Sequence, residues 1–171
     1  MNGIRLRNFK ENDSGRLLEL ANNEKISQNL RDGFPHPYTL KDAESFIQKC
    51  MVQDPVTTFA IDYNGEHVGN IGLSIGMDIY RKSAEIGYFI GEPYWNKGIA
   101  TMAVSLITEF GFAELGLVRI YAGVFEYNPA SMHVLEKCGF RKEAIHEKAI
   151  CKKDQIWDEH LFAKINPRFL H

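Results

Sequence analysis

The first twenty residues alternate apolar and polar positions in two different ways. Residues 4–9 (Ile-Arg-Leu-Arg-Asn-Phe) alternate with a period of two, which predicts a half-buried β-strand. The leucines Leu17, Leu18 and Leu20 then follow Asp13 at helical spacing. We therefore expect a helix here, with the side chain of Asp13 as its cap.

A second helix is predicted to begin after Thr39. The Thr39 hydroxyl can cap it, and Asp42, three residues later, can complete a capping box. Apolar residues follow at core spacing, at Ala43, Phe46 and Ile47. Between the two helices, residues 33–38 contain two prolines, each of which disfavours helical geometry in the residue before it, so this run is predicted to be a loop.

The middle of the chain has the pattern of a β-meander. Three runs, 56–63, 67–75 and 83–90, are rich in β-forming residues, and Asn64-Gly65 is a typical tight turn between the first two. We expect these runs to form three antiparallel strands.

The second half mixes helices with strands. The pattern predicts a helix over about 98–115, a strand over 119–125, a short helix over 129–138 and two final strands near 140–147 and 158–165. There is no internal repeat or linker. We therefore expect one α+β domain over residues 1–171, with a helical crossover between two strands in its second half.

Composition and charge narrow the possible partners. The 171 residues are 44% apolar and 25% charged, and 20 basic against 22 acidic residues leave a net charge of -2. This balance supplies no long-range field for a polyanion, so we expect neither nucleic acid nor a membrane as the main partner. Polar residues interrupt the apolar stretch 98–117, and no secretory signal opens the chain, which indicates a cytoplasmic protein.

The three cysteines, Cys50, Cys138 and Cys151, are odd in number and far apart. Their spacing matches neither a disulfide framework nor a metal site, so we expect reduced thiols and no metal.

The most informative segment, residues 85–101, is predicted to run from strand through turn to helix. Gly98 and Ala100 would let the main chain approach a ligand closely, and the first amides of the helix would point outward with the positive end of its dipole behind them. Lys97 adds a positive charge. These features predict a diphosphate site, although neither common nucleotide-binding glycine motif is present. The alternative is an ordinary helix start that contains a glycine.

With its neighbours, this segment resembles the Gcn5-related N-acetyltransferase (GNAT) superfamily, and within it the ribosomal-protein N-terminal alanine acetyltransferase (RimJ/RimL) type. The resemblance rests on residues 83–88, 92–101, 128–131 and 138–143 and on the order of elements along nearly the whole chain. It implies a mixed, mostly antiparallel sheet flanked by helices, and acetyl-CoA as the acetyl donor.

The resemblance also implies which residues bind the coenzyme. Tyr88, Phe89 and Ile90 would line the pantetheine arm and thioester, and the diphosphate would be bound by Asn96, Lys97, Gly98, Ile99, Ala100 and Thr101. The superfamily often has Gln or Arg three residues before the first small residue, where this chain has Trp95. We therefore expect the main chain, rather than that side chain, to bind the phosphates.

Glu85 is the candidate general base. An amine must lose a proton to attack a thioester, and strand alternation puts Glu85, Gly87 and Phe89 on the face opposite the apolar residues 84, 86, 88 and 90. The resemblance favours a base that acts through water at this position. The alternative is a carboxylate that only forms an ion pair with a neighbouring lysine or arginine.

Ser131 is the candidate acid. Asn128 followed by Pro129 is a strong helix start, which by itself is explained by capping. The resemblance adds that Asn128 binds a pantetheine amide and that Ser131 protonates the departing sulfur. Many superfamily members use a tyrosine four residues later instead, where this chain has Leu135, which leaves Ser131 or a water.

We expect the acceptor to be an N-terminal α-amine of a protein or peptide. Such an amine has a pKa of about 7.7 to 8.0, against about 10.4 for lysine, so it needs little help to lose its proton. Phe34, His36 and Tyr38 would shape the acceptor pocket. The loops near 29–38 and 78–81 carry both Asp and Arg, which does not indicate a polycation site.

Other possibilities stay open at this stage. One is a small-molecule amine acetyltransferase acting on a polyamine, an aminoglycoside-like compound or an amino acid, and another is an inactive module that only binds acyl-CoA. The oligomeric state is open between monomer and homodimer. A cluster of six basic residues, offset by acidic neighbours, is typical of a solvated hairpin face, although one of its members could meet the 3'-phosphate of the coenzyme: Lys137, Arg141, Lys142, Lys148, Lys152 or Lys153.

Overall fold

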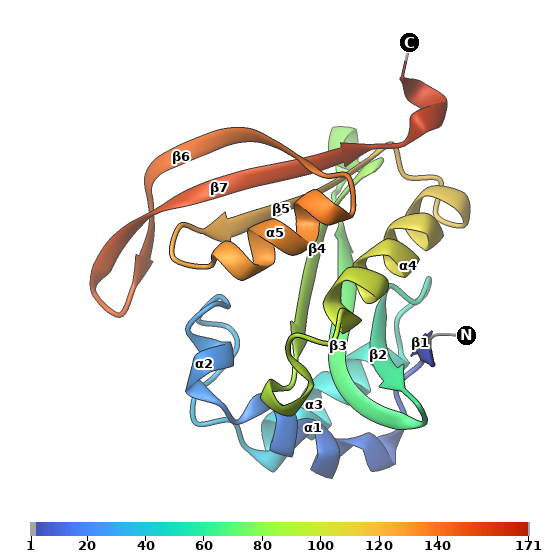
Figure 1. Cartoon of the computed structure of the whole chain (residues 1–171). Coiled ribbons are helices and arrows are strands. Elements are labelled where there is room, and N and C mark those ends of the chain that lie inside the picture. The colour runs from blue at the N-terminus through green and yellow to red at the C-terminus, as the bar shows by residue number, and fades with distance from the viewer. Residues whose placement is uncertain (1–2, 171) are drawn as a thin grey trace. The chain divides into compact units, whose positions relative to one another are not determined.

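A computed structural model describes residues 3–170, which form two compact units (Figure 1). Unit 1 comprises residues 3–72 together with Tyr88–Ala103, and unit 2 comprises Leu73–Gly87 together with residues 104–170. The α+β fold class predicted from the sequence is confirmed.

Seven strands form one mixed sheet in the order β1-β2-β3-β4-β5-β7-β6. The strands are β1 (Ile4–Arg7), β2 (Thr58–Tyr63), β3 (Glu66–Ile75), β4 (Ser83–Ile90), β5 (Arg119–Phe125), β6 (Arg141–Lys152) and β7 (Gln155–Ile165). The helices are α1 (Ser14–Ala21), α2 (Glu24–Ser27), α3 (Leu40–Met51), α4 (Ile99–Ala113) and α5 (Pro129–Lys137). Four single turns of 3-10 helix complete the elements: η1 (Glu11–Asp13), η2 (Asp78–Tyr80), η3 (Glu92–Tyr94) and η4 (Pro167–Phe169).

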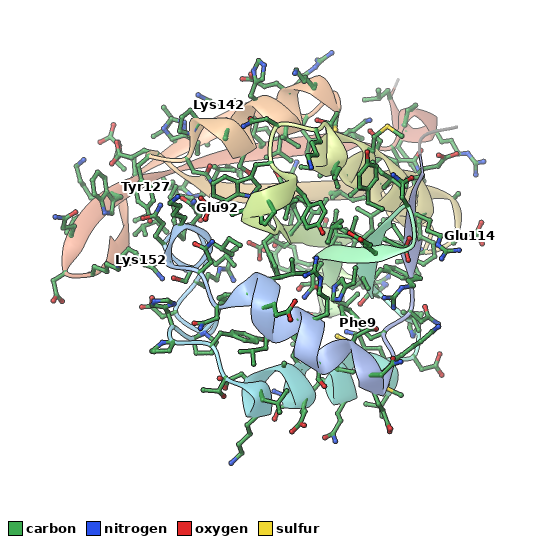
Figure 2. The ribbon with its side chains drawn as sticks, turned by 60° about the horizontal axis from the view of Figure 1, so that its bottom comes forward. Phe9, Glu92, Glu114, Tyr127, Lys142 and Lys152 are labelled. Carbon is green, nitrogen blue, oxygen red and sulfur yellow. The ribbon has the colours of Figure 1, made fainter. Side chains whose placement is uncertain are left out.

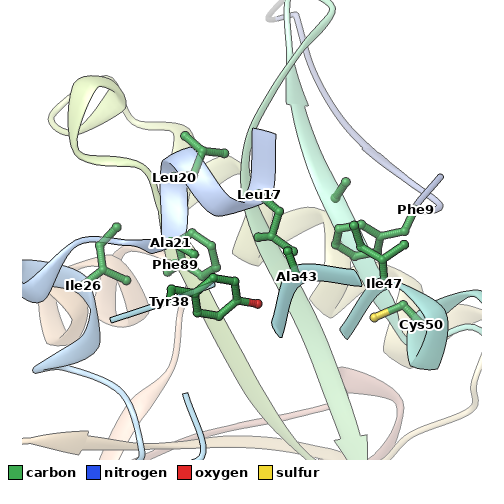
Figure 3. Close-up of a cluster of buried hydrophobic side chains, with 11 residues drawn as sticks. Phe9, Leu17, Leu20, Ala21, Ile26, Tyr38, Ala43, Ile47, Cys50 and Phe89 are labelled. Carbon is green, nitrogen blue, oxygen red and sulfur yellow. The ribbon is translucent and has the colours of Figure 1, made fainter. Parts of the chain in front are cut away.

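The core of unit 1 forms where α1 and α3 bring their apolar residues together (Figure 3). Leu17 of α1 and Ile47 of α3 are 0% and 1% exposed, and Phe9 packs edge-on against Phe46 with ring centroids 5.5 Å apart. Burying a side chain of this size contributes roughly 1.5 to 3 kcal/mol. This cluster holds the N-terminal helices in a fixed place beside the chain that leads into the candidate site.

Asp13 does not cap α1 as the sequence predicted. Its carboxylate instead accepts two hydrogen bonds from Arg7, both of 2.8 Å, and one from the Lys10 amide. A guanidinium fork satisfies both carboxylate oxygens at once, which a single helix amide cannot do. The predicted cap was therefore wrong, although the helix that follows it was right.

The start of α3 follows the prediction. Thr39 accepts a hydrogen bond from the Asp42 amide at 3.3 Å, and the Asp42 carboxylate accepts one from the Thr39 amide at 2.8 Å. Asn64-Gly65 also forms the expected turn between β2 and β3, with left-handed φ values of 53° and 90°.

Unit 2 contains the parallel strand pair of the predicted crossover, whose connecting segment belongs in part, at Tyr88–Ala103, to unit 1. The β4 and β5 strands are parallel and are joined through α4, whereas β7 pairs antiparallel with both β5 and β6. The core includes Leu135 of α5 and Phe162 of β7, both 0% exposed. At the end of α5, the Cys138 carbonyl accepts a hydrogen bond of 2.7 Å from Lys164 of β7, which ties this helix to the sheet.

The hairpin β6–β7 is longer than predicted at the end that carries its turn. Its strands meet at Lys153 and Asp154, both with left-handed φ, rather than ending near residues 147 and 158. Lys148 also has a positive φ of 53°, and the pairing register shifts between His146 and Ile150. This irregularity interrupts the period-two pattern, which explains why the sequence did not show the outer part of the hairpin.

None of the helices within residues 3–170 is long and apolar enough to cross a membrane. The three cysteines are not joined in disulfides, with Cys50 and Cys138 buried and Cys151 exposed.

Candidate active site

The predicted diphosphate site of unit 1 is an exposed turn between η3 and α4. Two of its residues, Asn96 and Gly98, have left-handed φ values of 60° and 75°. Trp95 to Gly98 are exposed, and a Cβ atom built on Gly98 would have no heavy atom within 4 Å. The backbone of Gly98 therefore borders open space, as close approach of a ligand requires.

The first turn of α4 continues this site. The Ile99 side chain is 1% exposed and anchors the helix, so only its main chain is available to a ligand. The Met102 amide donates to the Gly98 carbonyl at 3.1 Å, and the amides of Ile99 and Ala100 precede this first intrahelical bond. Ala100 and Thr101 are partly exposed. Amide donors at the positive end of a 15-residue helix suit an anion.

Trp95 has a role that its sequence position did not reveal. Its indole Nε1 donates a 2.7 Å hydrogen bond to the carbonyl of Ile90, the last residue of β4. The side chain thus ties the turn to the end of the strand. This explains how the turn is held without the Gln or Arg that the superfamily often has at this position.

The aromatic residues of unit 1 pack mainly into its core. The rings of Phe34 and Tyr38 lie 5.0 Å apart, and Phe34 meets Phe89 edge-on at 5.6 Å. Tyr38 and Phe89 are 5% and 8% exposed (Figure 3), and burial raises the pKa of Tyr38 to about 12. Any contact of Phe89 with a coenzyme would therefore run through its main chain.

The remaining predicted residues of this region differ in exposure. His36 is exposed on the loop before α3, Tyr88 is partly exposed and Ile90 is buried. Phe34, Tyr38 and Phe89 thus form one cluster with His36 at its exposed margin along the chain.

In unit 2, Glu85 lies where the pairing of β4 with β5 ends. The parallel ladder consists of three residue pairs, and the last joins Glu85 to Tyr121. Gly87 follows in β4, is exposed, and has open space where a Cβ atom would lie. Ala84 and Ile86 are buried, as the alternation predicted, and Glu85 is partly exposed on the other face. The carboxylate thus stands beside an accessible stretch of backbone.

A second carboxylate on this face, Glu159, was missed by the sequence analysis. Tyr121 pairs with Glu85 and therefore shares its face, and Gly123, two residues further along β5, points the same way. A Cβ atom on Gly123 would lie 2.3 Å from a Glu159 oxygen, so Glu159 of β7 extends over this glycine. The available signal was a glycine inside a strand, which often marks close approach of another group.

Asn128 and Ser131 come together at the start of α5. The Asn128 side-chain oxygen accepts a hydrogen bond of 3.3 Å from the Ser131 amide, so the predicted cap is present. Capping uses Oδ1 and leaves the Nδ2 group as a donor. Tyr127, the preceding residue, packs edge-on against Trp157 with ring centroids 4.9 Å apart, which fixes the entry to the helix. Leu135 is fully buried, as a core residue.

The six basic residues considered for the 3'-phosphate all lie on α5 and the β6–β7 hairpin. Lys148 pairs with Asp158 at 2.9 Å, and the Lys142 ammonium lies 5.6 Å from the ring centroid of Phe162. The position of the 3'-phosphate stays a prediction.

The chain matches the acetyltransferase (GNAT) domain model over residues 4–141. It belongs to the GNAT family. The chain is thus an N-acetyltransferase of the GNAT type, and the fold and enzyme class predicted from the sequence are confirmed. Within residues 3–170, no group of three or more His, Cys, Asp or Glu side chains could hold a metal ion.

Curated relatives include acetyltransferases with and without a known acceptor. The uncharacterized N-acetyltransferase YoaA of Bacillus subtilis is 28% identical over 95% of this chain and 93% of its own. The spermidine N(1)-acetyltransferase of Escherichia coli is 28% identical over 84% of this chain and 77% of its own.

Solved structures show the same fold. The microcin C7 self-immunity acetyltransferase MccE, solved with acetyl-CoA and AMP, is 25% identical, with a TM-score of 0.82 over 97% of this chain and 94% of its own. RimL, a ribosomal-protein α-N-acetyltransferase solved with coenzyme A, is 19% identical, with a TM-score of 0.83 over 96% and 95%. At that identity RimL supports the fold alone, so the RimJ/RimL subtype suggested by the sequence stays a prediction.

Proposed function

We propose that this GNAT enzyme transfers the acetyl group of acetyl-CoA to a primary amine, and that the amine is the N-terminal α-amine of a protein or peptide. The observation that carries the proposal is the exposed turn at 96–101. Its two left-handed residues and the open space over Gly98 lie at the start of a long helix, where main-chain amides precede the first intrahelical bond. This geometry fits a diphosphate.

The residues of β4 and α5 would perform the transfer itself. Acetyl-CoA supplies a thioester, whose carbonyl carbon forms a bond with the amine nitrogen as its bond to sulfur breaks. Glu85 would accept, through a water, the proton that the amine loses. Ser131 would give a proton to the sulfur, and Asn128 would orient the pantetheine arm through its Nδ2 donor. Gly87 would allow that arm to approach the backbone of β4.

An α-amine fits this machinery because its deprotonation is easy. With a pKa of about 7.7 to 8.0 it is partly neutral at pH 7, so a single carboxylate acting through water is sufficient. His36, exposed on the loop between Phe34 and Tyr38, would contact the first residues of the acceptor.

The second candidate acceptor is a small cationic amine such as a polyamine. Glu159 favours it, because this carboxylate shares the sheet face of Glu85 and could bind a second positive charge. The similarity to a spermidine acetyltransferase over 84% of this chain points the same way.

A panel of acceptors tests the proposal directly. Release of free thiol from acetyl-CoA would be followed with N-terminal peptides, the same peptides with blocked α-amines, spermidine and an aminoglycoside. We expect release with free N-terminal peptides and none with the blocked forms. Preference for spermidine, lost in Glu159→Gln, would establish the second candidate instead. Tight binding of acetyl-CoA without release for any amine would indicate the binding module.

A further inference from the structure

The exposed turn at 95–98 contains two left-handed residues, Asn96 and Gly98, and several contacts attach it to the rest of unit 1. The Trp95 indole donates to Ile90, and main-chain bonds run from the Gly91 amide to Val68 at 2.8 Å, from the Tyr94 amide to Gly91 at 2.9 Å and from the Trp95 amide to Glu92 at 3.2 Å. Side chains of η3 supply further attachments. Asn23 and Lys25 both bind the Glu92 carboxylate, which lies beside the α2 segment in Figure 2.

Tyr94 is a second side chain of η3 with two hydrogen-bond partners. Its hydroxyl donates a 2.8 Å hydrogen bond to the Glu66 carboxylate of β3 and accepts a 2.7 Å bond from Arg16 of α1. Arg16 is itself fixed, because its Nε donates to the His67 carbonyl at 3.1 Å. The hydrogen bond to Glu66 raises the pKa of Tyr94, so the hydroxyl stays a donor at neutral pH.

The ring of Tyr94 also faces the cation of the turn. The Lys97 ammonium lies 5.2 Å from the ring centroid, within the range of a cation–π contact, and the Arg16 guanidinium lies 5.8 Å away. A lysine side chain in free solution loses considerable rotamer entropy when it binds an anion, and contact with a fixed ring reduces that loss.

We propose that Tyr94 is a positioning residue for the diphosphate: its hydroxyl, fixed by Arg16 and Glu66, anchors the turn to α1 and β3, and its ring holds Lys97 ready beside the phosphates. The inference rests on the proposed function, because it takes residues 96–101 as the diphosphate site. Tyr94 need not touch the coenzyme in this arrangement.

The test compares a ligand that has the diphosphate with one that lacks it. Dissociation constants for CoA and for S-acetylpantetheine would be measured by NMR titration of backbone amide chemical shifts, a method that also detects weak binding. We expect Tyr94→Phe, which removes a charged hydrogen bond, to weaken the binding of CoA about 3- to 10-fold. Tyr94→Leu also removes the cation–π contact and should weaken this binding further. Binding of S-acetylpantetheine should stay unchanged in both variants.

Two further variants sharpen the comparison. Glu66→Gln keeps an acceptor for Tyr94 but removes its charge. It should therefore weaken the binding of CoA but not that of S-acetylpantetheine, and by less than Tyr94→Leu does. Tyr80→Phe, which removes an exposed hydroxyl from η2, is the matched control and should leave both constants unchanged.

Equal weakening of both ligands would overturn the inference, because it would show a general structural defect. Unchanged CoA binding in Tyr94→Leu would overturn it as well, while leaving the proposed function intact if the native protein prefers CoA to S-acetylpantetheine. A native protein that binds the two ligands equally well would contradict the diphosphate site itself, and with it both proposals.

Discussion

At the scale of single residues, the mechanism that we propose depends on polar side chains that lie beside glycines in the strands. Glu85 and Gly87 share one face of β4, and Glu159 extends over Gly123. Strand alternation was sufficient to predict the exposure of Glu85. It could not predict Glu159 or the bond from Trp95 to Ile90, because those contacts join residues whose proximity only the folded chain creates.

Replacing Glu85 by Gln should lower turnover without weakening the binding of CoA. A carboxamide is no base, so we expect turnover to fall about 100-fold or more, the usual contribution of general base catalysis. Steady-state rates of thiol release and a CoA titration would separate the two effects. Glu109→Gln, an exposed glutamate of α4, is the matched control and should behave like the native enzyme. An undiminished rate in Glu85→Gln would remove Glu85 from the mechanism.

His67 should make stability depend on pH. The ring is 5% exposed, its Nε2 lies 2.9 Å from Asn70 Oδ1 and 3.1 Å from the Gly69 carbonyl, and its buried Nδ1 has no hydrogen-bond partner within residues 3–170. Burial lowers the pKa of His67, and the nearby positive charge of Arg7 lowers it further. The hydrogen bond with Asn70 and the charge of Asp13 act in the opposite direction but are outweighed. The folded state therefore keeps His67 neutral in a range where the unfolded chain already binds a proton.

The unfolded chain takes up this proton below about pH 6.5, so stability should be complete above that pH and decrease as the pH falls below it. Chemical denaturation at pH 7.5, 6.5 and 5.5 would measure the slope. We expect His67→Gln to be less stable at pH 7.5 but to lose less stability on acidification than the native protein. His133→Gln, at an exposed position of α5, is the control. The same slope in His67→Gln and in the native protein would contradict the account.

At the scale of elements, the clearest sequence signals gave the best predictions. The bounds of β4 and β5 were correct and those of α5 within one residue, because regular alternation and an Asn-Pro helix start define them. The outer part of the β6–β7 hairpin was missed, because a left-handed lysine and a register shift interrupt its alternation. The short helix α2 was missed as well, since four residues are too few to show a period.

The capping box of α3 should contribute measurably to stability. In Thr39→Ala the Asp42 amide loses its side-chain acceptor, and we expect a loss of about 1 kcal/mol. Ser45→Ala, at an exposed position inside the same helix, is the matched control. Denaturant unfolding of the two variants would measure the difference, and equal stabilities would show that the cap contributes nothing.

At the scale of the whole molecule, the order of elements and the family match agree on an acetyltransferase. The crossover through α4 and the mostly antiparallel sheet were predictable from pattern, and the family from the residues around the turn. The acceptor was not predictable in the same way. We expect it to depend on loops and on residues such as Glu159, whose proposed role follows from its position rather than from a motif.

Gly98→Glu should abolish binding of CoA to the enzyme. The substitution strains a φ of 75° and puts a carboxylate into the open space that the diphosphate would occupy. Gly65→Glu has equal backbone strain, with a φ of 90° and nothing within 4 Å, but lies in the β2–β3 turn. Calorimetric titration should find CoA binding in the second variant alone, and equal binding in both would refute the placement of the phosphates.

The most direct measurement is a crystal structure of the enzyme with CoA. We predict that the diphosphate oxygens accept hydrogen bonds from main-chain amides within residues 96–101 and that the pantetheine arm follows the backbone of β4 past Gly87. A coenzyme bound elsewhere, with the amides of this turn making no contact to phosphate, would contradict the account.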